Sequence, residues 1–283
     1  HPNEIKELKN LEGVRPTVYT SEGIEEVASI APKIPVHLKI ETGMNRVGAS
    51  EKNSVLLANQ ITNSGLILEG VFTHFASADE PESSFPVEQS VLFDQVIKEL
   101  DDNGYQPTII HMANSAAAIN FPASHRSMVR PGIAIYGAEP SVDLRDRCDQ
   151  IGLKPTAQFE TEVRHIHEIK SGETVSYGRR WTAPHDTLLA TLPVGYGDGM
   201  PRSWWEKGCV IINGQRCPIR GVITMDQLMV EVGAKVAVGD KAILFGEQDG
   251  EVITAGEIAQ ATETISYEIL ASVGKRVPRI YEN

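Results

Sequence analysis

The first half of the chain alternates short apolar segments with amphipathic segments, and this alternation constrains the fold more than any other feature. The apolar segments are rich in β-branched residues and read as strands at residues 15–19, 35–40, 66–75, 108–112 and 132–136. Helical patterns cover residues 23–30, behind a predicted N-cap at Ser21, and residues 55–62, 87–102 and 116–120. Strands that alternate with helices form a parallel sheet, so the sequence predicts about five βα units.

The second half has a different pattern. Strands are predicted at residues 157–169, 187–194, 209–211, 228–232 and 241–245, and the pair Asn213-Gly214 is a hairpin signal. One helix is predicted over residues 255–272, because Thr254 and Glu257 form a capping-box pattern in front of it. We therefore predict an α/β domain over residues 1–152 and a mainly antiparallel β domain over residues 153–283.

Charge and composition exclude several classes of partner. The chain has 26 basic and 38 acidic residues, a formal net charge of −12. With no run of Lys or Arg longer than two, this balance argues against nucleic acid or an anionic membrane as the main partner. No apolar stretch approaches the length of a transmembrane helix. Three widely spaced cysteines fit reduced thiols in a cytosol-like compartment, and no metal site is expected.

Polar residues gather where the predicted parallel strands end, at Lys39, His74, Asn114 and Ser115. That edge of a parallel sheet carries the functional loops. A closed (β/α)₈ barrel needs eight units, so the sheet is either open and doubly wound or lacks three units at its start.

Nine sequence strings carry a resemblance to a known family. They are HLKIETGMNRVG (37–48), VFTHFASA (71–78), HMANSAA (111–117), VRPGIAIYG (129–137), SYG (176–178), VGYGDG (194–199), TMDQ (224–227), ISYE (265–268) and RVPRIY (276–281). In this order they closely resemble the alanine racemases. The resemblance implies a TIM-type barrel, here incomplete, followed by a mainly β domain. It also implies pyridoxal 5′-phosphate (PLP) as cofactor and L-/D-alanine interconversion in the cytoplasm, which supplies D-alanine for peptidoglycan.

The resemblance also implies the catalytic groups. Tyr177 would be the base that removes the Cα proton of L-alanine, with His74 hydrogen-bonded to it and Arg130 behind His74. A phenol with its ordinary pKa of about 10 is a poor base near neutral pH, so its anion needs such support. Arg130 would also face the pyridine nitrogen of PLP, where a group that keeps its proton leaves that nitrogen unprotonated.

Binding residues follow from the same resemblance. The phosphate site would comprise Ser115, Gly132, Ile133 and Tyr267, next to Asn114. Arg46 would contact the phenolic oxygen of the cofactor and the substrate carboxylate, held in place by Lys39, which is often carbamylated in the family. Met225 would bind the substrate carboxylate, and Tyr196 and Arg202 would narrow the entry. Tyr177 and Met225 would come from the partner subunit, which implies a homodimer with shared active sites.

One family feature is missing from this sequence. The lysine that forms the Schiff base with PLP lies in a Lys–Ala–Asn–Ala–Tyr–Gly-like segment, and none of the twelve lysines here does. Roughly the first 90 residues of the family pattern, or three βα units, are expected to be absent. The chain alone is therefore expected not to racemise alanine. Three alternatives are a non-catalytic truncated fragment, a racemase of another small amino acid such as serine, and a single-barrel PLP carrier, which the second domain disfavours.

Overall fold

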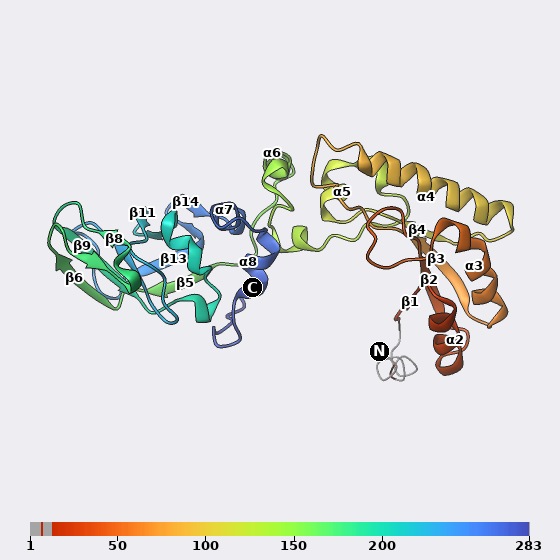
Figure 1. Cartoon of the computed structure of the whole chain (residues 1–283), viewed down its shortest axis with the longest axis horizontal. Helices are drawn as coiled ribbons and strands as arrows, with labels where there is room; N and C mark the ends of the chain where they lie inside the picture. Colours follow the sequence, from red (N-terminus) through yellow and green to blue (C-terminus); the bar gives the residue numbers. More distant parts are fainter. Residues whose placement is uncertain (1–6, 8–12, 283) are drawn as a thin grey trace. The chain divides into compact units, whose positions relative to one another are not determined.

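The parallel sheet predicted for the first half is present in the computed structural model, which describes residues 7 and 13–282. The chain divides into two compact units, His1–Gly132 and Ile133–Asn283 (Figure 1). In the described part of the first unit, the strands and helices are β1 (Thr17–Val18), α2 (Ser21–Ile30), β2 (Pro35–Lys39), α3 (Ser54–Asn63), β3 (Ile67–Phe72), α4 (Phe85–Asp102), β4 (Ile109–His111) and α5 (Ser115–Asn120), with short 3₁₀ helices at Glu51–Asn53 and Pro122–Ser124.

The four strands of the first unit pair in parallel in the order β1-β2-β3-β4. Helix α3 packs against β3 and lies between α2 and α4 (Figure 1). Because side chains alternate along a strand, Leu38 and Val71 share one face and are fully buried. The opposite face carries His37, Lys39 and His111, also buried. The sheet thus has one apolar face and one face with titratable groups.

Two predictions in this region are wrong. The N-cap of α2 is Thr20, whose hydroxyl oxygen accepts the N–H of Gly23 at 3.1 Å, and not Ser21. The segment predicted as a fifth strand at 132–136 is a 3₁₀ helix, Ile133–Tyr136. Its residues favour strands, but bonds between near neighbours, such as Gly137 N–H to the Ala134 carbonyl, satisfy its backbone instead.

The second unit is built mainly from antiparallel strands. Its strands are β5 (Phe159–Glu162), β6 (His165–Ile169), β7 (Thr174–Val175), β8 (Trp181–Thr182), β9 (Thr187–Leu192), β10 (Cys209–Ile212), β11 (Gln215–Pro218), β12 (Leu228–Glu231), β13 (Lys241–Gln248) and β14 (Glu251–Ile253). Its α-helices are α6 (Arg145–Gln150), α7 (Ala255–Ala261) and α8 (Ser266–Ser272), and its 3₁₀ helices are Ile133–Tyr136, Val142–Leu144, Tyr177–Arg179, Tyr196–Asp198 and Arg202–Glu206. The larger sheet runs β11-β10-β13-β14 with β5 also on β13, and a smaller one runs β12-β9-β6.

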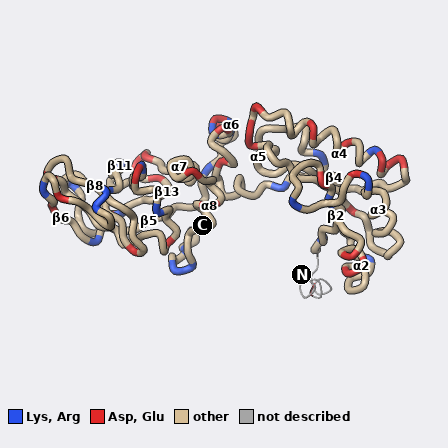
Figure 2. Tube along the Cα trace, viewed as in Figure 1, with Lys and Arg blue, Asp and Glu red and all other residues tan. Residues whose placement is uncertain are grey.

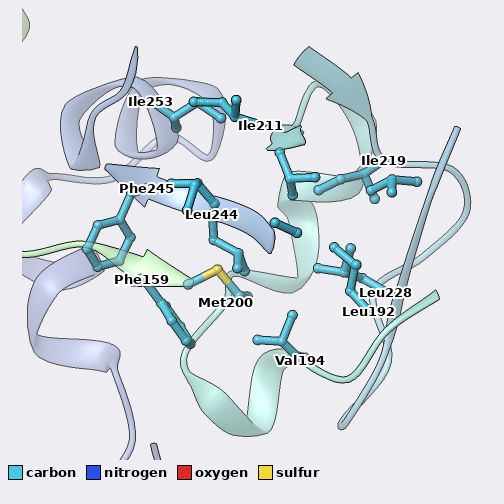
Figure 3. Packing of buried hydrophobic residues seen from close by; sticks show 14 of the residues in the cluster. Phe159, Leu192, Val194, Met200, Ile211, Ile219, Leu228, Leu244, Phe245 and Ile253 are labelled. Atoms are coloured by element: carbon cyan, nitrogen blue, oxygen red, sulfur yellow. The ribbon is translucent and has the colours of Figure 1, made fainter. Parts of the chain in front are cut away.

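A single apolar cluster forms the core of the second unit. Figure 3 shows Phe159 of β5, Met200 and two neighbours on β13, Leu244 and Phe245, in this cluster; the ring centroids of Phe159 and Phe245 lie 5.7 Å apart, edge to face. Such close packing is the main source of stability in a β domain.

Three further predictions concern the second unit. The Asn213-Gly214 hairpin is confirmed, since both residues have positive φ (51° and 68°) and join β10 to β11. The segment 157–169 is two strands rather than one, because β5 pairs with β13 and β6 pairs with β9. The helix predicted over 255–272 is broken into α7 and α8: Glu263 adopts φ 57°, which ends the first helix.

The predicted domain limit at residue 152 falls between α6 and β5, inside the second compact unit. Basic and acidic residues are interspersed along both units, as Figure 2 shows. In the described ranges, no helix combines the length and the apolar character needed to cross a membrane.

Candidate active site

Arg130 is the centre of a hydrogen-bonded cluster in the first unit. Its Nη1 donates to Nδ1 of His111 at 2.6 Å, and its Nη2 donates to Nδ1 of His74 at 3.2 Å. Nη2 also donates to the carbonyls of Thr73 (2.9 Å) and Met112 (3.2 Å). All four of these acceptors are neutral. Burial lowers the pKa of Arg130 to about 10, so the guanidinium stays charged near neutral pH.

A second set of contacts runs away from Arg130 through the sheet. Nε2 of His111 lies 2.8 Å from Nδ1 of His37, and Nε2 of His37 lies 3.3 Å from Glu69. Arg15 ends this series of hydrogen bonds by donating two of them to the Glu69 carboxylate. Hydrogen bonding from Arg15 lowers the pKa of Glu69. The Arg130 cation is therefore linked through two imidazoles to an ionised carboxylate.

These hydrogen bonds fix the tautomers of the imidazoles. A guanidinium can only donate, so Nδ1 of His111 and of His74 must accept, and each neutral ring carries its proton on Nε2. Burial, followed by the charge of Arg130, lowers the pKa of His111 to about 3 and that of His74 to about 4. Both imidazoles are therefore neutral at physiological pH.

A glycine makes the imidazole chain possible. The ring of His37 lies over Gly70 of β3, where a Cβ atom would come within 2.7 Å of it. Only a residue without a side chain lets His37 on β2 reach His111 on β4 across the intervening strand.

Lys39 and Arg46 lie at the end of β2 and in the loop after it. Lys39 is buried, and its pKa is lowered by burial and then by the charge of Arg46. Glu41 accepts the N–H of Gly43 at 2.6 Å, and the tight loop brings Gly48 against the Glu41 backbone, where a Cβ would clash at 2.8 Å. The charge of Arg46 also contributes to the lowered pKa of His74. The loop after β2 therefore acts electrostatically on the loop after β3.

Two of the residues predicted for the phosphate site, Ser115 and Gly132, meet in the first unit. The hydroxyl of buried Ser115 accepts the N–H of Gly132 at 2.7 Å. Asn114 is the N-cap of α5, its side-chain oxygen accepting the Ala117 N–H at 2.9 Å. The other two predicted members, Ile133 and Tyr267, belong to the second unit.

Tyr177 lies in a strained turn of the second unit. Ser176 before it has φ 64° and ψ −173°, a region that residues other than glycine rarely adopt. The Ser176 hydroxyl donates to the Val222 carbonyl at 2.6 Å, and Gly221 lets the two segments approach. The Tyr177 side chain is 72% exposed. The turn therefore directs the phenol outward.

Tyr196 and Met225 lie on neighbouring loops of the same unit. The N–H of Tyr196 donates to the Thr224 carbonyl (3.0 Å), and that of Gly197 donates to the Met225 carbonyl (2.9 Å). Arg276 also donates to the Met225 carbonyl. Tyr196 and Met225 are both partly exposed, and Arg202 begins the short helix that follows.

These features define a class of two-domain protein. A parallel α/β unit carries a half-buried cation and two neutral imidazoles where its strands end, and an antiparallel β unit carries an outward-facing phenol.

Comparison with known sequences identifies the family. Residues 1–140 match the family described as "Alanine racemase, N-terminal domain", and residues 156–281 match "Alanine racemase, C-terminal domain". An alanine racemase of Desulfosudis oleivorans is 43% identical over 267 residues, 90% of this chain and 68% of that protein. One of Halothermothrix orenii is 41% identical over 88% of this chain and 65% of that protein. The chain belongs to the alanine racemase family and spans about two thirds of the length of these relatives.

Solved structures agree with the family assignment. The alanine racemase of E. faecalis matches with a TM-score of 0.90 at 31% identity, over 100% of this chain and 76% of that one. The enzyme of Bacillus anthracis "with bound L-Ala-P" matches with a TM-score of 0.84 at 35% identity, over 94% of this chain and 70% of that one. The predicted fold, a parallel α/β region followed by an antiparallel β domain, is therefore confirmed over a partial length of these structures.

The first unit brings together Lys39, His74 and Arg130, and separately Ser115 and Gly132. The second unit brings together Tyr196 and Met225. Sequence reasoning did not single out His37 or Glu69. The spacing of His37 and Lys39, two residues apart on a strand, could have indicated that both share the face of the site.

Proposed function

We propose that this chain provides most of an alanine racemase active site, which interconverts L- and D-alanine with PLP. The observation that carries the proposal is Arg130: a half-buried, charged guanidinium at the strand ends whose acceptors are all neutral. A guanidinium only donates hydrogen bonds, so it can pair with the unprotonated pyridine nitrogen of PLP.

The residues of the first unit fit the cofactor. Arg130 would hold the pyridine nitrogen, Arg46 the phenolic oxygen, and the Ser115 hydroxyl with the Gly132 N–H the phosphate, joined by Ile133 and Tyr267. The Gly132 N–H and the Ser115 hydroxyl lie 2.7 Å apart, and both are donors of the kind that binds a phosphate, which supports this placement. When bound, PLP supplies an electron sink that acidifies the Cα–H of an amino acid.

Arg130 would control where the proton returns. Its pKa of about 10 keeps the guanidinium protonated, so it donates a hydrogen bond and does not release a proton. The electron density then stays near Cα, which favours reprotonation there over transamination.

Tyr177 would be the base for L-alanine. His74, neutral and protonated on Nε2, has a donor free to stabilise a phenolate, and Arg130 holds its other nitrogen. The 72% exposure of Tyr177 and its rigid turn support its use in an active site of a second copy of the chain. We therefore propose a homodimer in which Tyr177 and Met225 complete the partner's site, with Tyr196 and Arg202 at the entry.

Lys39 would hold Arg46 in place. Its burial and lowered pKa favour a neutral amine, the form that can be carbamylated. A carbamate would turn the repulsion between two cations into an attraction. We place the reaction in the cytoplasm, where D-alanine is used to make peptidoglycan.

The experiment uses two proteins, the 283-residue chain and the chain joined to a family segment that bears the Schiff-base lysine. We expect the joined protein to exchange the Cα proton of both alanine enantiomers with solvent. Tyr177→Phe should lower exchange from L-alanine by about 10²–10⁴-fold and spare D-alanine, because the lysine serves the latter. Tyr105→Phe, a tyrosine of the first unit without a proposed role, is the matched control.

The 283-residue chain is expected to be inactive and to form no borohydride-reducible adduct with PLP. Equal losses of exchange from both enantiomers in Tyr177→Phe would contradict the base assignment. A reduced pyridoxyl group on Lys39, or on any other lysine of this chain, would contradict the need for an added lysine.

A further inference from the structure

Gln89 is a fully buried amide on the first turn and a half of helix α4. Of the other buried residues of that helix, only Ser90 is polar; the rest are apolar: Pro86, Phe93, Val96 and Leu100. Burying an amide is unfavourable unless its polar atoms are hydrogen-bonded. A glutamine at this position therefore needs a reason beyond packing.

The side-chain amide of Gln89 forms hydrogen bonds with two backbone groups, one at His74 and one at Ala76. Its Nε2 donates to the His74 carbonyl at 3.1 Å, and its Oε1 accepts the Ala76 N–H at 3.0 Å. Residues 73–76 lie outside any strand or helix, so the sheet does not satisfy these two backbone groups. The donor and the acceptor can each meet only one atom of the amide, which fixes its orientation.

The same amide reaches the loop that carries Arg46. Nε2 also donates to the Thr42 hydroxyl at 3.1 Å, and Thr42 lies 2.7 Å from the Thr73 hydroxyl. Thr73 in turn accepts Arg130 at its carbonyl. One side chain thus ties the loop after β2 to the loop after β3.

We propose that Gln89 is a positioning residue, which holds His74 against Arg130 by clamping the backbone at His74 and Ala76. The inference rests on the proposed function only for the role of His74, because the clamp itself is a set of contacts within the first unit. No apolar residue could replace it, since three hydrogen bonds to two loops would be lost together.

The predicted consequence is a change in the environment of the His74 ring. Burial and the nearby charges of Arg130, Arg46 and Lys39 lower the pKa of His74 to about 4. When the clamp is released, the loop moves and the ring becomes more solvated and farther from these cations. Its pKa should then rise toward the ordinary value of about 6.5.

The test is NMR titration of the His74 imidazole between about pH 8 and 4, without PLP or alanine, with the resonance assigned by a His74→Asn variant. The wild-type signal should change only toward the acid end of this range, because its pKa is about 4. In Gln89→Met, of similar size but apolar, the midpoint should lie at least about one pH unit higher. Gln89→Asn, which keeps the amide but is one methylene shorter, should shift the same way by less.

Ser90→Ala is the matched control. Ser90 is buried beside Gln89 and donates to the Pro86 carbonyl within the same helix, so its loss lowers stability without touching either loop. A His74 pKa that is the same in Gln89→Met and in Gln89→Asn as in the wild type would overturn the proposal and leave Gln89 a structural residue. Gln89→Asn keeps the test decisive where Gln89→Met fails to fold.

The titration tests the role of Gln89 and the exchange assay tests the proposed function, so each proposal can be refuted without the other. If Tyr177→Phe does not affect L-alanine exchange but the His74 signal shifts as expected, the clamp stands and the proposed function falls. In the joined protein, Gln89→Met should lower kcat for both enantiomers about tenfold or more, as expected when a catalytic group is misplaced.

Discussion

The two units of this chain bury different kinds of side chain. Ten buried polar or charged residues of the described part lie in the first unit: His37, Lys39, Thr42, Ser54, Thr73, Gln89, Ser90, His111, Ser115 and Ser124. The described part of the second unit buries only three such residues, Glu139, Thr187 and Ser266, and its core cluster is apolar. The residues proposed for function are exposed there instead, Tyr177 by 72%, Met225 by 52% and Tyr196 by 42%.

This difference shows that the two units contribute different kinds of group to the proposed site. The first unit holds a half-buried charge, Arg130, among neutral acceptors, imidazoles with fixed tautomers and a buried amide. The second unit presents groups on its surface, and an apolar core under strained loops suffices for that. The three tryptophans, Trp181, Trp204 and Trp205, all lie in the second unit, whereas the longer helices α2, α3 and α4 lie in the first. Tryptophan fluorescence therefore reports the second unit, and the helical signal in far-UV circular dichroism comes mainly from the first.

The largest expected effect comes from the apolar core of the second unit. Leu244→Ala removes a fully buried side chain from β13 and should lower the free energy of unfolding by about 2–5 kcal/mol. Urea unfolding followed by tryptophan fluorescence should show the loss, while the helical signal keeps its midpoint. Val238→Ala, at an exposed position of the same unit, is the control. Equal shifts of both signals would mean that the two units unfold as one.

Acid should affect the first unit before the second. The folded pKa values of His74 (about 4) and His111 (about 3) lie below their unfolded value, so unfolding takes up protons below about pH 6.5. Stability is complete above that pH and falls as the pH drops toward 4, by up to about 1.4 kcal/mol per pH unit for each ring. The urea midpoint of the helical signal should therefore decrease between about pH 7.5 and 5.5.

The fluorescence midpoint should change less in this window. The carboxyls of the second unit with lowered pKa, such as Asp240, which accepts the Ala237 N–H, lose stability only at more acidic pH. His111→Asn should remove about half of the pH dependence of the helical signal. A pH-independent helical midpoint would mean that the rings are not held neutral.

Gly70→Ala should destabilise the first unit by about 1–3 kcal/mol, because the new methyl group meets the His37 ring at 2.7 Å. The ring must move, which weakens its bond to His111. Gly233→Ala is the control in the second unit, where no atom lies within 4 Å of the new carbon. Urea midpoints for both variants check the prediction, and similar losses at the two glycines would contradict it.

The smallest effect is expected at the strained turn before Tyr177. Ser176→Gly relieves the backbone strain but loses the bond to the Val222 carbonyl, so the net change should be within about 1 kcal/mol. Ser176→Ala keeps the strain and loses the same bond, and should be the less stable of the two. This reverses the usual advantage of alanine over glycine. Fluorescence-detected unfolding that ranks alanine above glycine would exclude a strained turn.

Much of the fold followed from local patterns. The periodicity of residues 87–102 predicted α4 to within two residues, and Asn213-Gly214 predicted its hairpin. The same reasoning failed at residues 132–136, where residues that favour strands form a 3₁₀ helix. It also failed at Glu263, where one predicted helix is divided into two. In both places backbone bonds between near neighbours outweighed residue preference.

The sequence by itself determined which elements form and which motifs the strand ends carry, because side-chain periodicity and turn preferences act over a few residues. Only the tertiary structure decided that His37 meets His111, 74 residues away, across a glycine, and that Gln89 spans two loops. Those contacts depend on the register of parallel strands and on how a helix packs over their ends, which are set by the path of the whole chain rather than by any local pattern.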